Sequence, residues 1–92
     1  MTIDLTGNLY VADSGNNLIR KLVSGSSGYT VSTIAGTNGS GYINGPGLTA
    51  KFFYPLGITI DSSGNLYVID LFNKVIRKLV PGANGYTVST IA

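Results

Sequence analysis

An internal repeat constrains this chain more than any other feature of its sequence. When the sequence is shifted by 57 residues, residues 2–35 align with residues 59–92, and 24 of the 34 aligned positions are identical. Eight of the ten mismatches fall where turns are expected, and the other two, Ala12/Ile69 and Leu18/Val75, are exchanges of apolar residues. Turns tolerate substitution better than the elements they connect. The chain therefore contains most of two copies of one structural unit.

Each copy has the pattern of four short β-strands. In the second copy, residues 59–61, 65–70, 75–80 and 86–91 are separated by turn residues. These segments are rich in Val, Ile, Tyr and Thr, and none has the 3.6-residue period of an amphipathic helix. The second segment is apolar on both sides, which is typical of a strand in a sheet that is covered on both faces. We predict an all-β fold of two four-stranded antiparallel sheets, stacked as the blades of a β-propeller.

The same segmentation divides the chain into three parts. Residues 1–35 are expected to form a first blade with a short first strand, residues 36–57 a glycine-rich loop between blades, and residues 58–92 a second blade. One helical turn is expected over residues 48–52. The aromatic residues at positions 52–54 are predicted to pack as wedges between the blades.

The repeated sequence resembles the NHL repeat. The resemblance rests on residues 7–22 (GNLYVADSGNNLIRKL), on their second copy at residues 64–79, and on the preceding residues 44–58 (NGPGLTAKFFYPLGI). It covers nearly the whole chain, although the motif contains no His and Asn44 stands where the family commonly has Asp. The resemblance implies propeller blades, in rings that most often have six of them.

Two blades cannot close a ring by themselves. The chain has 92 residues, only ten of them charged, and a mean hydropathy of +0.28, so we expect apolar surface that contacts other copies or the rest of a larger propeller. Head-to-tail contacts between copies can close into a ring. Three chains would give six blades, which we favour, and four would give eight. The high identity of the copies also suits an engineered fragment or a reconstructed ancestral sequence.

Composition excludes several kinds of site. The chain has no Cys, no His and no Glu, so disulfides, thiolate zinc sites, thiol nucleophiles and the usual catalytic triads cannot be built. We therefore expect no enzymatic activity and no cofactor. The net charge of +2 is too small to favour nucleic acid as a partner. No signal sequence or membrane-spanning segment is expected, which leaves the compartment open.

The charged residues repeat with the strands. Asp4 matches Asp61 and Asp13 matches Asp70, each at a strand end, where a carboxylate can accept backbone N–H bonds in the following turn. The alternative is a ring of carboxylates that binds a cation in the central channel, but the acids are not concentrated as in a calcium loop, and we predict no metal site.

The basic pairs at positions 20–21 and 77–78 also repeat. Adjacent strand residues face opposite sides, so one of each pair should meet an Asp at a contact between blades and the other should face solvent. The alternative is an anion-binding strip in an assembled ring.

Residues 36–47 contain many glycines but lack the spacing of a phosphate-binding loop. We interpret them as a connector between blades. Asn38 begins a glycosylation sequon, to which we give no weight without a secretory context.

The predicted binding face is the end of the propeller that carries the loops between blades and between the second and third strands. Phe72, which replaces Gly15 of the first copy, should pack on a neighbour, or else offer a contact surface. The candidate residues are Asn16, Asn17, Tyr42, Asn44, Lys51, Tyr54, Phe72, Asn73 and Lys74.

The sequence favours a non-enzymatic NHL-type propeller module, a scaffold or binding platform for protein or carbohydrate that assembles from copies of itself. One alternative is a fragment of a propeller enzyme of the lyase or lactonase type, which the absence of His and Glu disfavours. The other is an RNA-binding NHL propeller, which would need a more basic surface.

Overall fold

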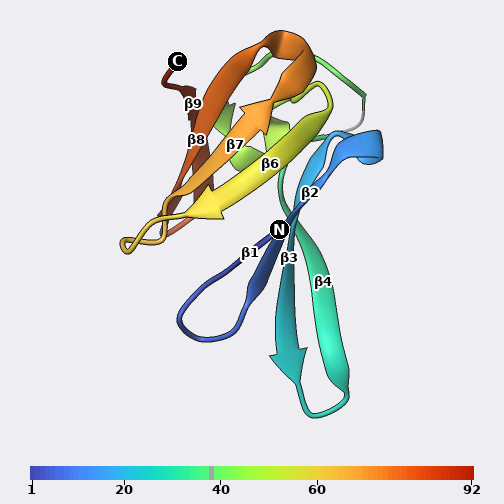
Figure 1. Cartoon of the computed structure of the whole chain (residues 1–92), viewed down its shortest axis with the longest axis vertical. Helices are drawn as coiled ribbons and strands as arrows, with labels where there is room; N and C mark the ends of the chain where they lie inside the picture. Colours follow the sequence, from blue (N-terminus) through green and yellow to red (C-terminus); the bar gives the residue numbers. More distant parts are fainter. Residues whose placement is uncertain (38) are drawn as a thin grey trace.

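Two antiparallel β-sheets make up the chain (Figure 1). The computed structural model describes residues 1–37 and 39–92, so Asn38 of the sequon lies outside the described residues. The first sheet has the strand order β1 (Thr2–Ile3), β2 (Leu9–Asp13), β3 (Leu18–Gly25) and β4 (Gly28–Ala35). The second has the order β5 (Gly45–Pro46), β9 (Gly85–Thr90), β8 (Val75–Gly82), β7 (Leu66–Asp70) and β6 (Pro55–Ile60). The predicted all-β, blade-like fold is confirmed.

The turn between the second and third strands of each blade has the same backbone conformation. A short 3-10 helix, η1 (Ser14–Asn16) in the first blade and η3 (Leu71–Asn73) in the second, is followed by a residue with left-handed backbone angles. That residue is Asn17 with φ 58° in one copy and Lys74 with φ 59° in the other. The repeat therefore preserves the turn while the side chains change.

The segment expected as a connecting loop adds structure to the second blade. β5 pairs with the outer strand β9, so this sheet has five strands rather than four. Pro46 fits there because an edge strand does not need every N–H group. The helical turn that was expected over residues 48–52 is η2 (Gly47–Thr49), which begins and ends earlier than expected. At Gly47, a Cβ atom would lie 2.5 Å from the carbonyl oxygen of Ile34, so this close approach requires glycine.

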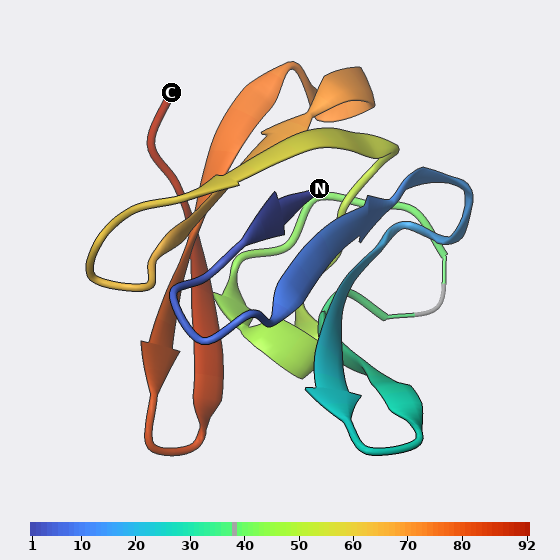
Figure 2. The ribbon, with the colours of Figure 1, turned by 60° about the horizontal axis from the view of Figure 1, so that its bottom comes forward.

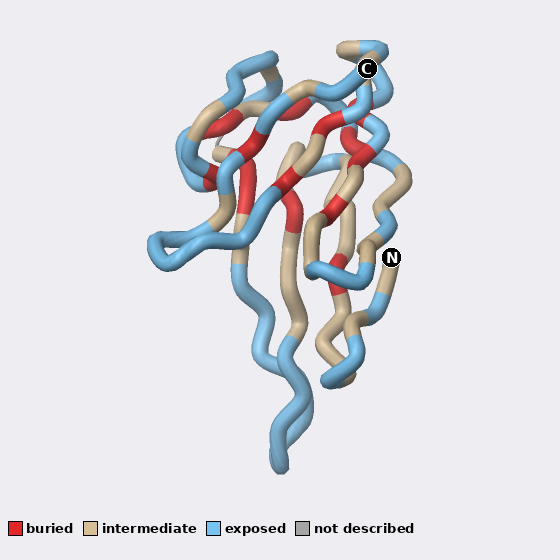
Figure 3. Tube along the Cα trace, turned by 90° about the vertical axis from the view of Figure 1, so that its left-hand side faces the viewer, coloured by how far each residue is buried: buried red, intermediate tan, exposed pale blue. Residues whose placement is uncertain are grey.

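The core lies where the two sheets meet (Figure 2). Strands β1 and β2 contact β6, and β4 contacts β9. Phe52 is fully buried, as expected of a wedge between blades, whereas Phe53 and Tyr54 remain partly exposed. Figure 3 shows the buried stretches gathered near this contact, with the far end of the β3–β4 hairpin exposed. The buried apolar residues are Tyr10, Ile19, Ala35, Ala50, Phe52, Leu66, Val68, Leu79 and Val88. Among the described residues, no helix is long and apolar enough to cross a membrane.

Two valines of the second blade provide a test of this core. Val68 is fully buried, whereas Val80 is 40% exposed. Replacing Val68 with Ala removes buried methyl groups and should lower the free energy of unfolding by about 1–3 kcal/mol, and Val80→Ala should cost less than about 1 kcal/mol. Urea denaturation of the two variants measures both values, and equal losses would contradict the assignment of the core.

Candidate functional site

The most extensive polar cluster surrounds the guanidinium of Arg77 on β8. Arg77 and Asp70 are fully buried, and Nη1 of Arg77 lies 2.7 Å from Oδ2 of Asp70. The second Nη1 bond goes to the carbonyl oxygen of Lys51 at 3.0 Å. Nη2 donates to the carbonyl oxygen of Ile43 at 2.8 Å and to Oδ1 of Asn44 at 2.7 Å, and Nε donates to the same Oδ1 at 3.1 Å. These five bonds match the five N–H groups of an arginine.

Two aromatic rings complete the surroundings of this guanidinium. Its Cζ atom lies 4.9 Å from the ring centre of Tyr42 and 4.7 Å from that of Phe52, within the range of cation–π contacts. The Tyr42 hydroxyl is in turn hydrogen-bonded to Oγ1 of Thr90 at 2.8 Å. Arg77 therefore binds residues 41–54, which we call the lead-in segment, to the second blade.

Asp70 and Asn73 fasten the two ends of the lead-in segment. Oδ1 of Asp70 accepts the backbone N–H of Phe53 at 2.8 Å, and Nδ2 of Asn73 donates to the carbonyl oxygen of Gly41 at 2.8 Å. The Asn73 amide also donates to Oδ2 of Asp70 at 2.7 Å. Asp70, Asn73 and Arg77 thus act as one unit, which we call the second triad.

The first blade carries the same three side chains in a different environment. Asn16 donates to Oδ2 of Asp13 at 3.0 Å, and Nη1 of Arg20 donates to the same oxygen at 3.2 Å. The Arg20 and Asp13 side chains are 30% and 29% exposed. Nε of Arg20 is itself buried and has no acceptor among the described residues. We call Asp13, Asn16 and Arg20 the first triad.

The partners of the basic residues differ from the sequence prediction in one respect. One residue of each basic pair was expected to meet an Asp at a contact between blades. In the structure that residue is the Arg, but Arg20 and Arg77 pair with the Asp of the adjacent strand in their own blade. Diagonal neighbours on adjacent antiparallel strands share a face, which explains this pairing. The neighbouring Lys21 and Lys78 lie over the rings of Tyr10 and Tyr67.

The other two carboxylates close turns, as predicted. Oδ1 of Asp4 accepts the N–H groups of Thr6 at 3.0 Å and Asn8 at 2.9 Å, and the Tyr10 hydroxyl donates to Oδ2 at 2.9 Å. Asp61 makes the same bonds in the second blade, with Ser63, Asn65 and Tyr67 as donors.

These bonds also affect ionisation. Desolvation raises the pKa of the Asp4 carboxyl, but the hydrogen bonds from Asn8, Thr6 and Tyr10 outweigh it, so its pKa lies well below the ordinary value. The pKa of Asp61 is lowered in the same way, with desolvation again opposed by bonds from Asn65 and Tyr67. Both carboxylates therefore stabilise their turns in the ionised form.

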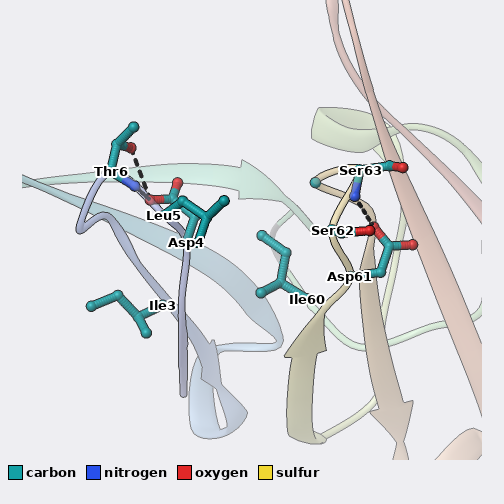
Figure 4. A pocket seen from close by; sticks show the side chains of 9 residues that line it. Ile3, Asp4, Leu5, Thr6, Ile60, Asp61, Ser62 and Ser63 are labelled. Carbon is teal, nitrogen blue, oxygen red and sulfur yellow. Dashed lines mark hydrogen bonds between the residues drawn. The ribbon is translucent and has the colours of Figure 1, made fainter.

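The two Asp turns, one between β1 and β2 and the other between β6 and β7, line a cavity of about 520 Å3 (Figure 4). Its walls are residues 3–6 and 60–64. Figure 4 shows the carboxylates of Asp4 and Asp61 bonded to their own turns. In the part of the chain that is described, no three His, Cys, Asp or Glu side chains come together as metal ligands do.

The nine predicted binding residues fall into distinct groups. Tyr42, Asn44, Lys51 and Asn73 belong to the contact between the lead-in segment and the second triad, and Asn16 belongs to the first triad. Lys74 is exposed beside η3.

The remaining candidates form an aromatic group. Phe72 stacks on Tyr54 and meets Phe53 edge to face, with 5.1 Å between ring centres in each pair. Asn17 holds Tyr54 in place, because its Oδ1 accepts the Tyr54 N–H at 2.7 Å. Phe72 thus packs on neighbours as expected, yet 54% of it stays exposed.

Sequence reasoning missed the central role of Asp70 and Arg77. The sequence feature that could have indicated this role is an Asp followed by an Arg seven positions later, which occurs in both copies. No sequence feature indicates which carbonyl groups of the lead-in segment accept hydrogen bonds from Arg77.

Comparison with known proteins bears on the nature of the two copies. No family model matches the chain. NHL repeat-containing protein 3 of Homo sapiens is 32% identical over 75 residues, and its Mus musculus counterpart is 33% identical over 75 residues. The two copies are NHL repeats. These matches cover 82% of the chain but only 20% of either relative. The chloroplastic protein SUPPRESSOR OF QUENCHING 1 of Arabidopsis thaliana is 37% identical over 71 residues, 77% of the chain and 6% of that protein.

The two arginines of these NHL repeats should differ in their importance for stability. Arg77→Met leaves Asp70 as a buried, unpaired charge and should cost about 3–5 kcal/mol of unfolding free energy. Arg20→Met removes a partly exposed pair and should cost less than about 1 kcal/mol. Urea denaturation followed by circular dichroism measures the difference, and similar losses would show that Arg77 is not the stronger anchor.

The Asp turns of the two NHL repeats should make the fold sensitive to acid. Because their folded-state pKa lies below that of an unfolded Asp, about 3.9, these carboxylates stabilise the fold above about pH 4, and this stabilisation is lost as the pH falls further. The double variant with Asp4→Asn and Asp61→Asn should therefore have a lower melting temperature at pH 7 and a smaller decrease between pH 4 and pH 2. Leu5→Asn, at an exposed position of the same turn, is the control and should keep the parent slope.

Proposed function

We propose that this chain is a non-enzymatic NHL-repeat module that assembles with copies of itself into a closed propeller and serves as a scaffold or binding platform. A trimer with six blades is the favoured assembly. The observation that carries the proposal is a repeated face that is covered in one blade and bare in the other.

In the first blade this face packs against the second blade. Ile19 and Ala35 lie on it and are fully buried. The repeat places Ile76 and Ala92 at the equivalent positions of the second blade, where Ile76 is 38% exposed and Ala92 is exposed as well. Ile69, the cross-strand neighbour of Ile76, is 49% exposed. The second blade thus presents an apolar face of the kind that the first blade buries.

The opposite face of the first blade is the matching surface. In the second blade, Val68, Leu79 and Val88 face the first blade and are buried. Their equivalents are Val11 and Leu22, which are half-buried, and Val31, which is 51% exposed. One copy can therefore place the bare face of its second blade on the first blade of the next, a head-to-tail contact that closes if the rotation permits.

The binding platform would use the aromatic group of Phe53, Tyr54 and Phe72. All three rings remain 38–54% exposed although they pack on one another. Partly exposed aromatic rings suit protein or carbohydrate ligands, because they offer apolar area with little conformational freedom to lose. The composition of the chain, without His, Cys or Glu, supports binding rather than catalysis.

The assembly is tested by the mass in solution. Light scattering should give the mass of three 9.6 kDa chains. Ile69→Glu places a charge on the bare face and should yield a folded monomer, whereas Leu48→Glu, on η2 at the outer strands, should leave the trimer intact. A parent chain that stays a monomer at all concentrations would refute the self-assembly, and a mass of four chains would refute the six-bladed ring.

A further inference from the structure

We propose that the first triad, together with the open edge of β4, is a docking site for an extended peptide segment with the chemistry of residues 41–54. The occupant is a second copy of the lead-in segment, separate from the one already bound to the second triad. The inference rests on the internal repeat and does not depend on the proposed ring.

The second triad shows what such a site binds. There, Arg77 uses three acceptors of the lead-in segment, Asp70 accepts one of its N–H groups, and Asn73 donates to one of its carbonyl oxygens. The equivalent bonds of the first triad run only within the triad in the described part of the chain. The same donors and acceptors are therefore present in the first blade, and no segment among the described residues is bound to them.

Arg20 gives the most direct sign of a missing partner. Its Nε atom is buried and has no acceptor among the described residues, and leaving a buried donor unpaired is costly. In the second blade the equivalent Nε donates to Oδ1 of Asn44. An Asn side chain on the incoming segment would satisfy this donor and a second N–H of the same guanidinium, as Asn44 does for Arg77.

The edge of β4 beside the first triad is open at the positions where β5 covers the equivalent strand β9 in the second blade. β5 pairs with β9 through Gly45 with Val88 and Pro46 with Thr87. The repeat maps those β9 residues to Val31 and Thr30 on β4, which is the last strand of its sheet. An extended segment can therefore add to this edge by β-augmentation, with its Asn over Arg20.

Apolar contacts in the first blade also fit this occupant. Val11, Leu22 and Val31 are half-buried or exposed, whereas Val68, Leu79 and Val88 share a buried cluster with Phe52 of the lead-in segment. A second copy of the segment would bring an equivalent Phe to the first blade. In the second blade these residues share the cluster with Phe52 and with residues of the first blade, so a bound segment and a neighbouring blade can cover this face together. The polar and apolar observations thus point to the same occupant of the β4 edge.

The test is a titration of the whole chain with a synthetic peptide of residues 41–54, followed by NMR and calorimetry. We expect saturable binding with a Kd of about 1 mM or tighter, and a shifted, exchange-protected Hε resonance of Arg20. Arg20→Lys cannot supply the forked donors and should weaken binding at least about tenfold. Lys21→Ala, the neighbouring cation on the opposite face, should bind as the parent does.

A change in the peptide keeps the test independent of how any protein variant folds. The peptide with Asn44→Ala should bind at least about tenfold more weakly to the unaltered chain. The inference is overturned by absence of binding, by equal affinity of the two peptides, or by shifts at Arg77 instead of Arg20. Light scattering on the same samples reports self-assembly separately, so failure of the peptide to bind is distinguishable from failure of the ring.

Discussion

The buried guanidinium of Arg77 is the interaction on which the arrangement of the two blades depends. A buried charge is unfavourable unless it is paired and its hydrogen-bonding groups are satisfied. Here Asp70 balances the charge, and every N–H group has an acceptor. Three of the acceptors come from residues 43, 44 and 51, so the contact fixes the path of the chain between the blades. That path places β5 on the edge of the second sheet and Phe52 in the core.

The first blade shows that identical side chains do not ensure an identical environment. Asp13, Asn16 and Arg20 repeat the residue types of the second triad and keep the bonds among themselves, yet the Arg20–Asp13 pair is partly exposed while Arg77–Asp70 is fully buried. The difference is the lead-in segment, which covers one triad and not the other. Burial of a repeated triad is thus set by the segment that covers it as much as by the sequence of the repeat itself.

The parts of the fold that could be predicted are those that depend on the residues of one short segment. The strands follow from β-branched and aromatic runs between turn residues, and the structural roles of Asp4 and Asp61 follow from their place before Gly-containing turns. β5 could not be predicted, because Gly45–Pro46 has the composition of a loop. The acceptors of Arg77 were equally hidden, since backbone carbonyl groups occur at every residue and only the folded path brings these two to the guanidinium. Phe72 was predictable as a packing residue because it stands out against Gly15.

Edge protection and charge satisfaction are coupled in this fold. The lead-in segment pairs with β9 through Gly45 and Pro46, and the adjoining Asn44 binds Arg77, so one segment both covers a strand edge and satisfies a buried charge. An uncovered edge invites pairing with other chains. In the first blade the edge of β4 and Nε of Arg20 are left without these partners among the described residues. An arbitrary strand could pair with the edge of β4 but would leave Nε of Arg20 without an acceptor. A segment with the sequence of the lead-in, which carries an Asn beside its edge-pairing residues, can satisfy both.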